Sequence, residues 1–353
     1  MKIAVITSRA TSLMNVARDI AYVAKKRGLT PVMLDYIANP HDLARMVDSA
    51  VIVMTMNPLI ARSWFLLNRE LNRLGVPSFI YTTVEGRLPL RHIKDWIRRD
   101  VLFVANSSYT RAKLQETGVV VLDTVLHGIN LEEVDIVLKR RDAVRRIIEN
   151  KLGQGIIFGV VASNHPRKGL DLFSDVVRMV REKTRDAKFY IVSTAGAKSL
   201  FEGIDGVYVD TNFGKRTRTE ILAIISAFDW YIQPSLAEGF GLPVLEAMAL
   251  GVPCIHLAYE PLTEFSDPKA NIWVPYDRIE FFDFKEGIEY ELHLYEPKEF
   301  VDSILTAVEI TKKRRDEYRE RKEMARKTAM NFDVMKLYPR LIDLLDEVEK
   351  AIQ

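Results

Sequence analysis

The sequence lacks the features that would tie it to a disulfide framework or to a membrane span. Cys254 is the single cysteine among 353 residues, which excludes a disulfide within the chain and any multi-cysteine metal site. No apolar run approaches the roughly 18 residues that a membrane-spanning helix needs. Residues 1–6 read directly as a strand and not as a signal peptide, so we expect a cytoplasmic protein.

A strong excess of charge is also missing. The chain has 50 Lys and Arg residues against 48 Asp and Glu, a formal net charge of +2. That balance does not fit a protein built around a nucleic-acid backbone, so no nucleic-acid partner is expected and any basic function must be local.

Motifs for metal ions and nucleoside triphosphates are absent too. There is no Asp-x-Asp pair, and the six histidines are scattered, so we expect neither a metal site nor a cofactor. The segment Gly214-Lys215-Arg216-Thr217 lacks the earlier glycine of a phosphate-binding P-loop, because Val209 stands at that place. This argues against an ATPase.

What the sequence does contain is typical of a two-domain globular protein. It is 48% hydrophobic and 28% charged, and at roughly 150 residues per domain its length favours two domains. A charged helical stretch followed by Gly153-Gln154-Gly155 marks a boundary. We therefore expect an N-terminal domain over 1–150, a C-terminal domain over 151–330, and a final helix over 331–353 that packs back on the N-terminal domain.

Short Val- and Ile-rich runs alternate with longer amphipathic stretches such as 12–27 and 108–117, which is typical of a parallel sheet with crossover helices. The expected fold class is α/β, with two Rossmann-like domains that face each other across a cleft. Ligands of such sheets bind at the carboxyl ends of the strands. The expected strands of the two series are 2–7, 31–35, 51–55, 78–82, 101–105 and 119–126, then 156–162, 188–193, 206–209, 230–233, 252–256 and 272–274.

The most informative segment runs from residue 229 to 253 and reads as a strand, a glycine-containing loop, a helix and a second strand. Such a junction directs free backbone N–H groups and a helix dipole at its ligand, which suits a phosphate. Glu238 lies in the loop and Glu246 lies in the helix, so two carboxylates can accept hydrogen bonds from hydroxyls along one extended ligand. A phosphate between two hydroxylated groups is the chemistry of a nucleotide sugar.

A second strand-loop-helix junction, over 158–171, carries the adjacent cations Arg167 and Lys168. These cations would stabilise the negative charge that grows on a departing diphosphate, which is a transition-state effect. The alternatives for both junctions are structural. The helix dipole alone favours a Glu near a helix start, and the two cations could belong to a solvated turn.

These residues resemble the signature of retaining nucleotide-sugar glycosyltransferases of family 4, which have the GT-B fold. The family has two Glu separated by seven residues, and this chain has Glu238-Gly-Phe-Gly-Leu-Pro-Val-Leu-Glu246 after Pro234-Ser235. Similarity is strongest over 163–264. The segments Asn106-Ser107-Ser108 and His127-Gly128-Ile129-Asn130 resemble the family's serine-led helix and Asn-Gly-Val-Asp turn.

The resemblance implies a role for each matching residue. Glu238, Arg167 and Lys168 would be catalytic, with Lys168 on the diphosphate. Glu246 would hold the ribose hydroxyls. The remaining donor-binding residues would be Asp210, Thr211, Asn212 and Phe213 near the nucleobase, and Gly239, Phe240, Gly241 and Leu242 at the hexose and phosphate. Ser163, five residues before Lys168, would also belong to the donor site.

The chain departs from the family's pattern in three places. Ser163 stands where the family usually has Arg, so Arg167 would have to compensate for the lost charge. Residues 9–15 replace the usual Gly-Gly loop after the first strand, and Thr83 and Glu85 stand near the place of a common His. These departures concern the acceptor side more than the donor side.

Two further segments carry weaker interpretations. Over 87–99, Leu90, Ile93, Trp96 and Ile97 would share one face of a helix with cations on the others. That face could lie on an anionic membrane, although packing on the domain's own sheet is the commoner role of such a stripe. Alternation over 276–296 predicts a hairpin inserted between the last strand and the following helix.

Together these observations predict a hexosyltransferase that moves a hexose from UDP- or GDP-hexose to an acceptor hydroxyl, with retention and without a metal ion. The acceptor could be a saccharide, a lipid-linked sugar or a protein. The alternatives are a catalytically silent nucleotide-sugar binder or scaffold, and a sugar-nucleotide epimerase of the same fold.

Overall fold

The computed structural model describes residues 1–352 and divides the chain into two compact units. Unit 1 comprises residues 1–130, 281–291 and 332–352, and unit 2 comprises 131–280 and 292–331. The sequence placed the boundary near residue 150, whereas the units part after Asn130. The reason is packing: α6 (Leu131–Leu138) and α7 (Arg141–Leu152) contact α9 (Arg218–Ser226) of unit 2.

Unit 1 is built on a six-stranded parallel sheet in the order β2-β1-β3-β4-β6-β7. Its four central strands are almost completely buried, as the sequence pattern predicts, whereas the two edge strands are partly exposed. The strands are β1 (Lys2–Thr7), β2 (Thr30–Leu34), β3 (Ser49–Thr55), β4 (Ser78–Thr83), β6 (Leu102–Ala105) and β7 (Val120–Thr124). The helices of its N-terminal segment are α1 (Thr11–Lys26), α2 (Pro40–Ala44), α3 (Arg62–Arg73), α4 (Asp95–Asp100) and α5 (Ser108–Gln115).

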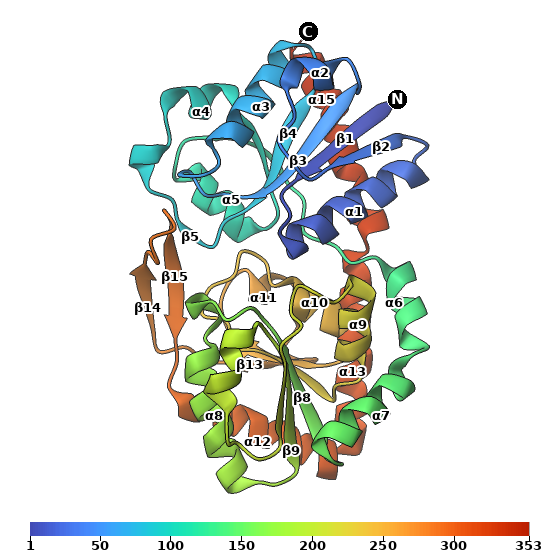
Figure 1. Cartoon of the computed structure of the whole chain (residues 1–353), viewed down its shortest axis with the longest axis vertical. Coiled ribbons are helices and arrows are strands. Elements are labelled where there is room, and N and C mark those ends of the chain that lie inside the picture. Colours follow the sequence, from blue (N-terminus) through green and yellow to red (C-terminus); the bar gives the residue numbers. More distant parts are fainter. Residues whose placement is uncertain (353) are drawn as a thin grey trace. The chain divides into compact units, whose positions relative to one another are not determined.

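Unit 2 contains a second six-stranded sheet in the order β10-β9-β8-β11-β12-β13, so the expectation of two Rossmann-like α/β domains is confirmed (Figure 1). Its strands are β8 (Ile156–Val161), β9 (Ala187–Val192), β10 (Val207–Asp210), β11 (Trp230–Gln233), β12 (Cys254–Leu257) and β13 (Ile272–Val274). Its further helices are α8 (Leu170–Lys183), α10 (Leu242–Ala249), α11 (Leu262–Phe265), α12 (Pro297–Lys313) and α13 (Arg315–Ala329).

The last segment of the chain returns to unit 1. It forms α14 (Val334–Leu337), capped by the Asp333 side chain, and α15 (Pro339–Ile352). The apolar stripe of α15 packs on β3 and β4, and Arg340 Nε lies 2.7 Å from an Asp123 carboxylate oxygen. Residues 332–352 thus complete the core of the first sheet.

The hairpin predicted over 276–296 is present as β14 (Arg278–Phe282) and β15 (Glu289–Leu294), shown in orange-brown in Figure 1. These strands form a small sheet with β5 (Gly86–Arg87) in the order β14-β15-β5. The hairpin tip, residues 281–291, therefore belongs to unit 1 although the sequence on both sides of it belongs to unit 2.

The prediction that residues 87–99 form one helix with an apolar face is wrong. The segment consists of the end of β5, a short 3-10 turn at Leu90–His92 and α4, with extended residues between them. Ile93 and Ile97 are buried, and Arg69 lies over the half-buried Trp96 ring. Only Leu90 is exposed, so no continuous apolar stripe faces outward. Within residues 1–352, no helix is both long and apolar enough to cross a membrane.

Gly159, in the middle of β8, is fixed by packing. A Cβ atom at this position would lie 1.9 Å from the Phe228 ring, which occupies the space beside the strand. We therefore expect Gly159→Ala to lower the free energy of unfolding of unit 2 by about 1–3 kcal/mol, as overpacked cores do. Urea denaturation followed by circular dichroism measures this loss. Adding Phe228→Leu should recover part of it, and a fully stable Gly159→Ala protein would contradict the packing.

Candidate functional site

The turn between β8 and α8 places the two adjacent cations. It is a single 3-10 turn, Pro166–Lys168, in which the His165 Nδ1 atom accepts a hydrogen bond from the Arg167 backbone N–H at 3.2 Å. Gly169 ends the turn with φ of +63°, and a Cβ there would lie 2.6 Å from the Pro234 carbonyl oxygen. Only glycine allows this close approach of the turn to the segment that follows β11.

That segment, residues 234–238, is called the donor loop below, after the donor binding that the sequence analysis predicts for it. Its Leu236 backbone N–H donates to the Arg167 carbonyl at 2.8 Å, and the Arg167 Nη1 atom donates to the Ala237 carbonyl at 3.1 Å. The two junctions, far apart in the sequence, are therefore joined by hydrogen bonds within unit 2.

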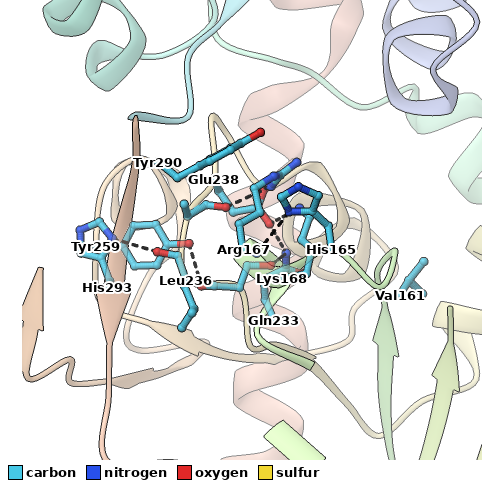
Figure 2. Close-up of polar contacts among 12 residues, drawn as sticks. Val161, His165, Arg167, Lys168, Gln233, Leu236, Glu238, Tyr259, Tyr290 and His293 are labelled. Atoms are coloured by element: carbon cyan, nitrogen blue, oxygen red, sulfur yellow. Dashed lines mark hydrogen bonds and ion pairs between the residues drawn. The ribbon is translucent and has the colours of Figure 1, made fainter. Parts of the chain in front are cut away.

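Glu238 lies at the centre of this arrangement (Figure 2). Its side chain is 6% exposed; Lys168 Nζ lies 2.5 Å from Oε1, and Arg167 Nη1 lies 3.6 Å from Oε2. The structure thus brings together the three residues predicted to be catalytic. One carboxylate and two cations give the cluster a net charge of +1, which suits an anionic ligand.

Two polar residues that the sequence analysis did not select hold Glu238 in place. Gln233 Nε2 donates to Glu238 Oε1 at 2.6 Å and contacts Ser235 Oγ at 2.8 Å, while the Tyr231 hydroxyl donates to Gln233 Oε1 at 2.7 Å. The available signal was Gln233 itself, a polar residue at the carboxyl end of an otherwise apolar strand. Gln233, Tyr231 and Ser235 are all buried, so the Glu238 carboxylate has a fixed orientation.

Opposing effects act on the pKa of Glu238. Burial raises it, but the positive charges of Lys168 and then Arg167 lower it more, so the pKa stays below its ordinary value. The buried carboxylate is therefore ionised at neutral pH, and it keeps both cations ordered without a ligand.

Glu246 lies on α10 in a separate ion-pair group. Arg218 Nε lies 3.8 Å from Glu246 Oε1 and 3.4 Å from Glu133 Oε2, and the Thr219 hydroxyl donates to Glu133 at 3.0 Å. The sequence analysis selected Glu246 but not Arg218, whose place at the start of α9 after the Thr217 cap gave no sign of this pairing.

The loop predicted to face a nucleobase is organised by Asp210. Its carboxylate accepts hydrogen bonds from the Arg216 guanidinium at 2.5 and 2.9 Å, from Asn212 Nδ2 at 2.7 Å and from the Tyr190 hydroxyl at 3.2 Å. Burial raises the pKa of Asp210, but the hydrogen bonds from Arg216 and Asn212 lower it by more. The pKa of Asp210 therefore lies below its ordinary value. Asp210 therefore fixes the conformation of this loop through its hydrogen bonds to Asn212 and Arg216. The Phe213 backbone N–H adds a hydrogen bond to the Ser193 carbonyl.

The glycine-containing loop ends at Gly241, the N-cap of α10. Gly241 has φ of +99°, and a Cβ there would lie 2.3 Å from Leu262 Cδ2. The preceding Phe240 ring stacks on Phe265 with centroids 4.7 Å apart. These contacts press the loop against α11 and fix the start of α10, with Pro243 in its first turn. Ser163 is half-buried just before the Arg167 turn.

Residues 1–352 contain no cluster of three or more His, Cys, Asp or Glu side chains arranged to hold a metal ion. The positive charge near Glu238 comes from Lys168 and Arg167.

The chain is similar to known glycosyltransferases. Residues 155–283 match the model of a family described as glycosyl transferases group 1. The chain is 28% identical over 348 residues to the uncharacterized glycosyltransferase 335 of Sulfolobus islandicus rod-shaped virus 1. This match covers 97% of this chain and 100% of that protein.

A shorter match is 29% identical over 142 residues, 38% of this chain and 36% of the relative. That relative is the UDP-Gal:alpha-D-GlcNAc-diphosphoundecaprenol alpha-1,3-galactosyltransferase of Escherichia coli. Among solved structures, Anabaena HepE in complex with UDP and glucose has a TM-score of 0.67 at 12% identity, covering 98% of this chain and 100% of that one. This last likeness shows a shared fold alone.

Removal of the Lys168 charge should destabilise the protein, because the Glu238 carboxylate is buried. We expect Lys168→Met to reduce the free energy of unfolding by up to about 3 kcal/mol at pH 7.5, because Glu238 loses the nearer of its two cations and keeps the more distant Arg167. The variant raises the pKa of Glu238, so lowering the pH protonates that group and shrinks the deficit relative to the wild type. Chemical denaturation at pH 7.5 and pH 5 measures both effects.

The matched control for this experiment is the double variant Lys168→Met/Glu238→Gln, which removes both charges and should regain most of the lost stability. A Lys168→Met deficit that is the same at both pH values would contradict the pairing.

Proposed function

We propose that this chain, a group 1 glycosyltransferase with the GT-B fold, transfers a hexose from a UDP-hexose to an acceptor hydroxyl with retention of configuration. The observation that carries the proposal is the convergence of Lys168 and Arg167 on Glu238 at the junction of two strand ends. This cluster offers positive charge for a diphosphate and a fixed carboxylate for sugar hydroxyls in one place.

In this proposal unit 2 binds the donor. Lys168 and Arg167 hold the diphosphate together with the backbone N–H groups at the start of α10, whose dipole adds positive potential. Glu238 accepts hydrogen bonds from the hexose, and Glu246 accepts them from the ribose hydroxyls. The loop over 210–213 lies against the nucleobase.

Lys168 and Arg167 act mainly on the transition state. As the bond between the anomeric carbon and the diphosphate oxygen breaks, negative charge grows on that oxygen, and the preorganised cations stabilise it. The acceptor oxygen forms the new bond on the same face of the sugar, and its proton passes to the leaving phosphate oxygen. Arg167 takes the place of the arginine that the family carries where this chain has Ser163.

The choice of UDP over GDP is supported by three observations. The Escherichia coli relative is named for UDP-Gal, and the Anabaena structure contains UDP and glucose. In addition, the Asp210 carboxylate already accepts hydrogen bonds from Arg216, Asn212 and Tyr190, so it does not present a spare acceptor for the N–H groups of guanine.

A catalytically silent nucleotide-sugar binder is the second candidate, and Ser163 is the residue that favours it. Product formation separates the two. An active transferase releases UDP much faster when an acceptor is present, whereas a silent binder gains thermal stability from the nucleotide without turnover.

The donor is tested by thermal shift with UDP, GDP, ADP and their hexose conjugates. We expect UDP and UDP-hexoses to raise the melting temperature most. Glu246→Ala should weaken UDP affinity by about tenfold, because the ribose hydroxyls lose hydrogen bonds to a charged acceptor. Glu202→Ala, at an exposed position of unit 2, is the control and should bind as the wild type does. Stabilisation by GDP alone would contradict the assignment of UDP. Equal UDP affinity of Glu246→Ala and Glu202→Ala would contradict the role of Glu246.

A further inference from the structure

Strand β15 is held at its two ends by different parts of the molecule. Its beginning belongs to unit 1, where Glu289 and Tyr290 pair antiparallel with β5. The Glu291 carboxylate lies 2.8 Å from Lys113 Nζ and accepts a hydrogen bond from the Tyr109 hydroxyl at 3.3 Å. These contacts fix the first half of β15 on the first sheet's unit.

The other half of β15 belongs to unit 2 and contacts the donor loop. The His293 backbone N–H donates to the Leu236 carbonyl at 2.8 Å, and the His293 Nδ1 atom lies 3.1 Å from the same oxygen. A carbonyl oxygen has two lone pairs and accepts both bonds. Leu236 is thus bound through its oxygen to β15 and through its N–H to Arg167.

Tyr259 adds a second attachment of the donor loop. Its ring stacks on the His293 ring with centroids 4.0 Å apart and planes 6° apart (Figure 2). Its hydroxyl donates to the Ser235 carbonyl at 2.8 Å. His293 and Tyr259 are both almost fully buried. Two consecutive carbonyl groups of the donor loop therefore depend on this stacked pair.

We propose that His293 and Tyr259 are positioning residues for Glu238 and Arg167, and that β15 is a tether through which unit 1 influences the donor loop. Neither side chain needs to contact the donor. They fix Ser235 and Leu236, which precede Glu238 and bind the Arg167 main chain. The inference rests on the proposed function only in assigning the donor to Glu238 and Arg167; the attachment of the loop can be measured without any ligand.

The experiment compares two variants in unit 2 that each lose one tyrosine hydroxyl with a hydrogen bond to a backbone carbonyl. Tyr259→Phe removes the hydrogen bond to Ser235 at the carboxyl end of β11 but keeps the ring that stacks on His293. Tyr318→Phe removes a hydrogen bond of 2.9 Å to the Asp229 carbonyl at the opposite end of the same strand. A merely structural contribution should affect both variants alike.

Hydrogen exchange of the ligand-free full-length protein is the first readout. We expect amides of a peptide spanning 234–241 to exchange about fivefold faster in Tyr259→Phe, as expected for the loss of one net hydrogen bond, and to remain at the wild-type rate in Tyr318→Phe. Equal exchange in the two variants would overturn the positioning role.

Steady-state kinetics with a UDP-hexose is the second readout. Tyr259→Phe should lower kcat by several-fold with little change in KM, because misplaced cations bind a diphosphate but stabilise the transition state less well. Tyr318→Phe should retain wild-type kcat. A wild-type protein that neither binds nor turns over UDP-hexoses would refute the proposed function, while the exchange data would still decide the attachment of the loop.

The tether is tested separately with Glu291→Gln. This substitution weakens the contacts of β15 with Lys113 and Tyr109 in unit 1 and leaves the His293 contacts with the donor loop unchanged. We expect faster exchange of the 234–241 peptide, by a smaller factor than in Tyr259→Phe because the pairing of β15 with β5 remains. Wild-type exchange of this peptide in Glu291→Gln would overturn the tether.

Discussion

The ion-pair cluster of Glu238 with Lys168 and Arg167 is the interaction on which the rest of the site depends. A buried carboxylate left without partners costs several kcal/mol, so the fold must bring cations to it. The two cations come from the turn after β8, and the carboxylate comes from the loop after β11. Because β8 and β11 are neighbours in the sheet, these two turns meet at one edge. The electrostatic requirement of Glu238 and the topology of the sheet therefore support each other.

The surrounding polar groups keep this cluster rigid before any ligand arrives. Gln233 orients the carboxylate, and hydrogen bonds between Arg167 and the donor loop fix the main chain on both sides of the ion pair. Preorganised charges need little rearrangement when negative charge develops on a leaving group. The same rigidity explains why close backbone contacts and glycines surround the site, as at Gly169, where a side chain would strike the Pro234 carbonyl.

Unit 1 receives two segments from the second half of the sequence, and both complete it structurally. The final helix α15 covers β3 and β4, and the hairpin tip adds strands to β5. The hairpin is the less expected of the two, because its alternating pattern predicts a local excursion and gives no sign of its partner. Strand β5 has two residues, too short to be recognised as a strand by pattern.

The sequence by itself determined the fold class and the order of the strands along the chain, and it predicted Arg167, Lys168 and Glu238 as candidate site residues, because strand periodicity and short motifs are local features. It did not determine which groups neighbour them. Gln233 contacts Glu238 from the end of β11, and Arg218, His293 and Tyr259 act through contacts between separate segments of the chain. Ile93 and Ile97, which were predicted to share a membrane-facing stripe, proved to be buried. Such contacts depend on strand order and packing, which only the tertiary structure decides.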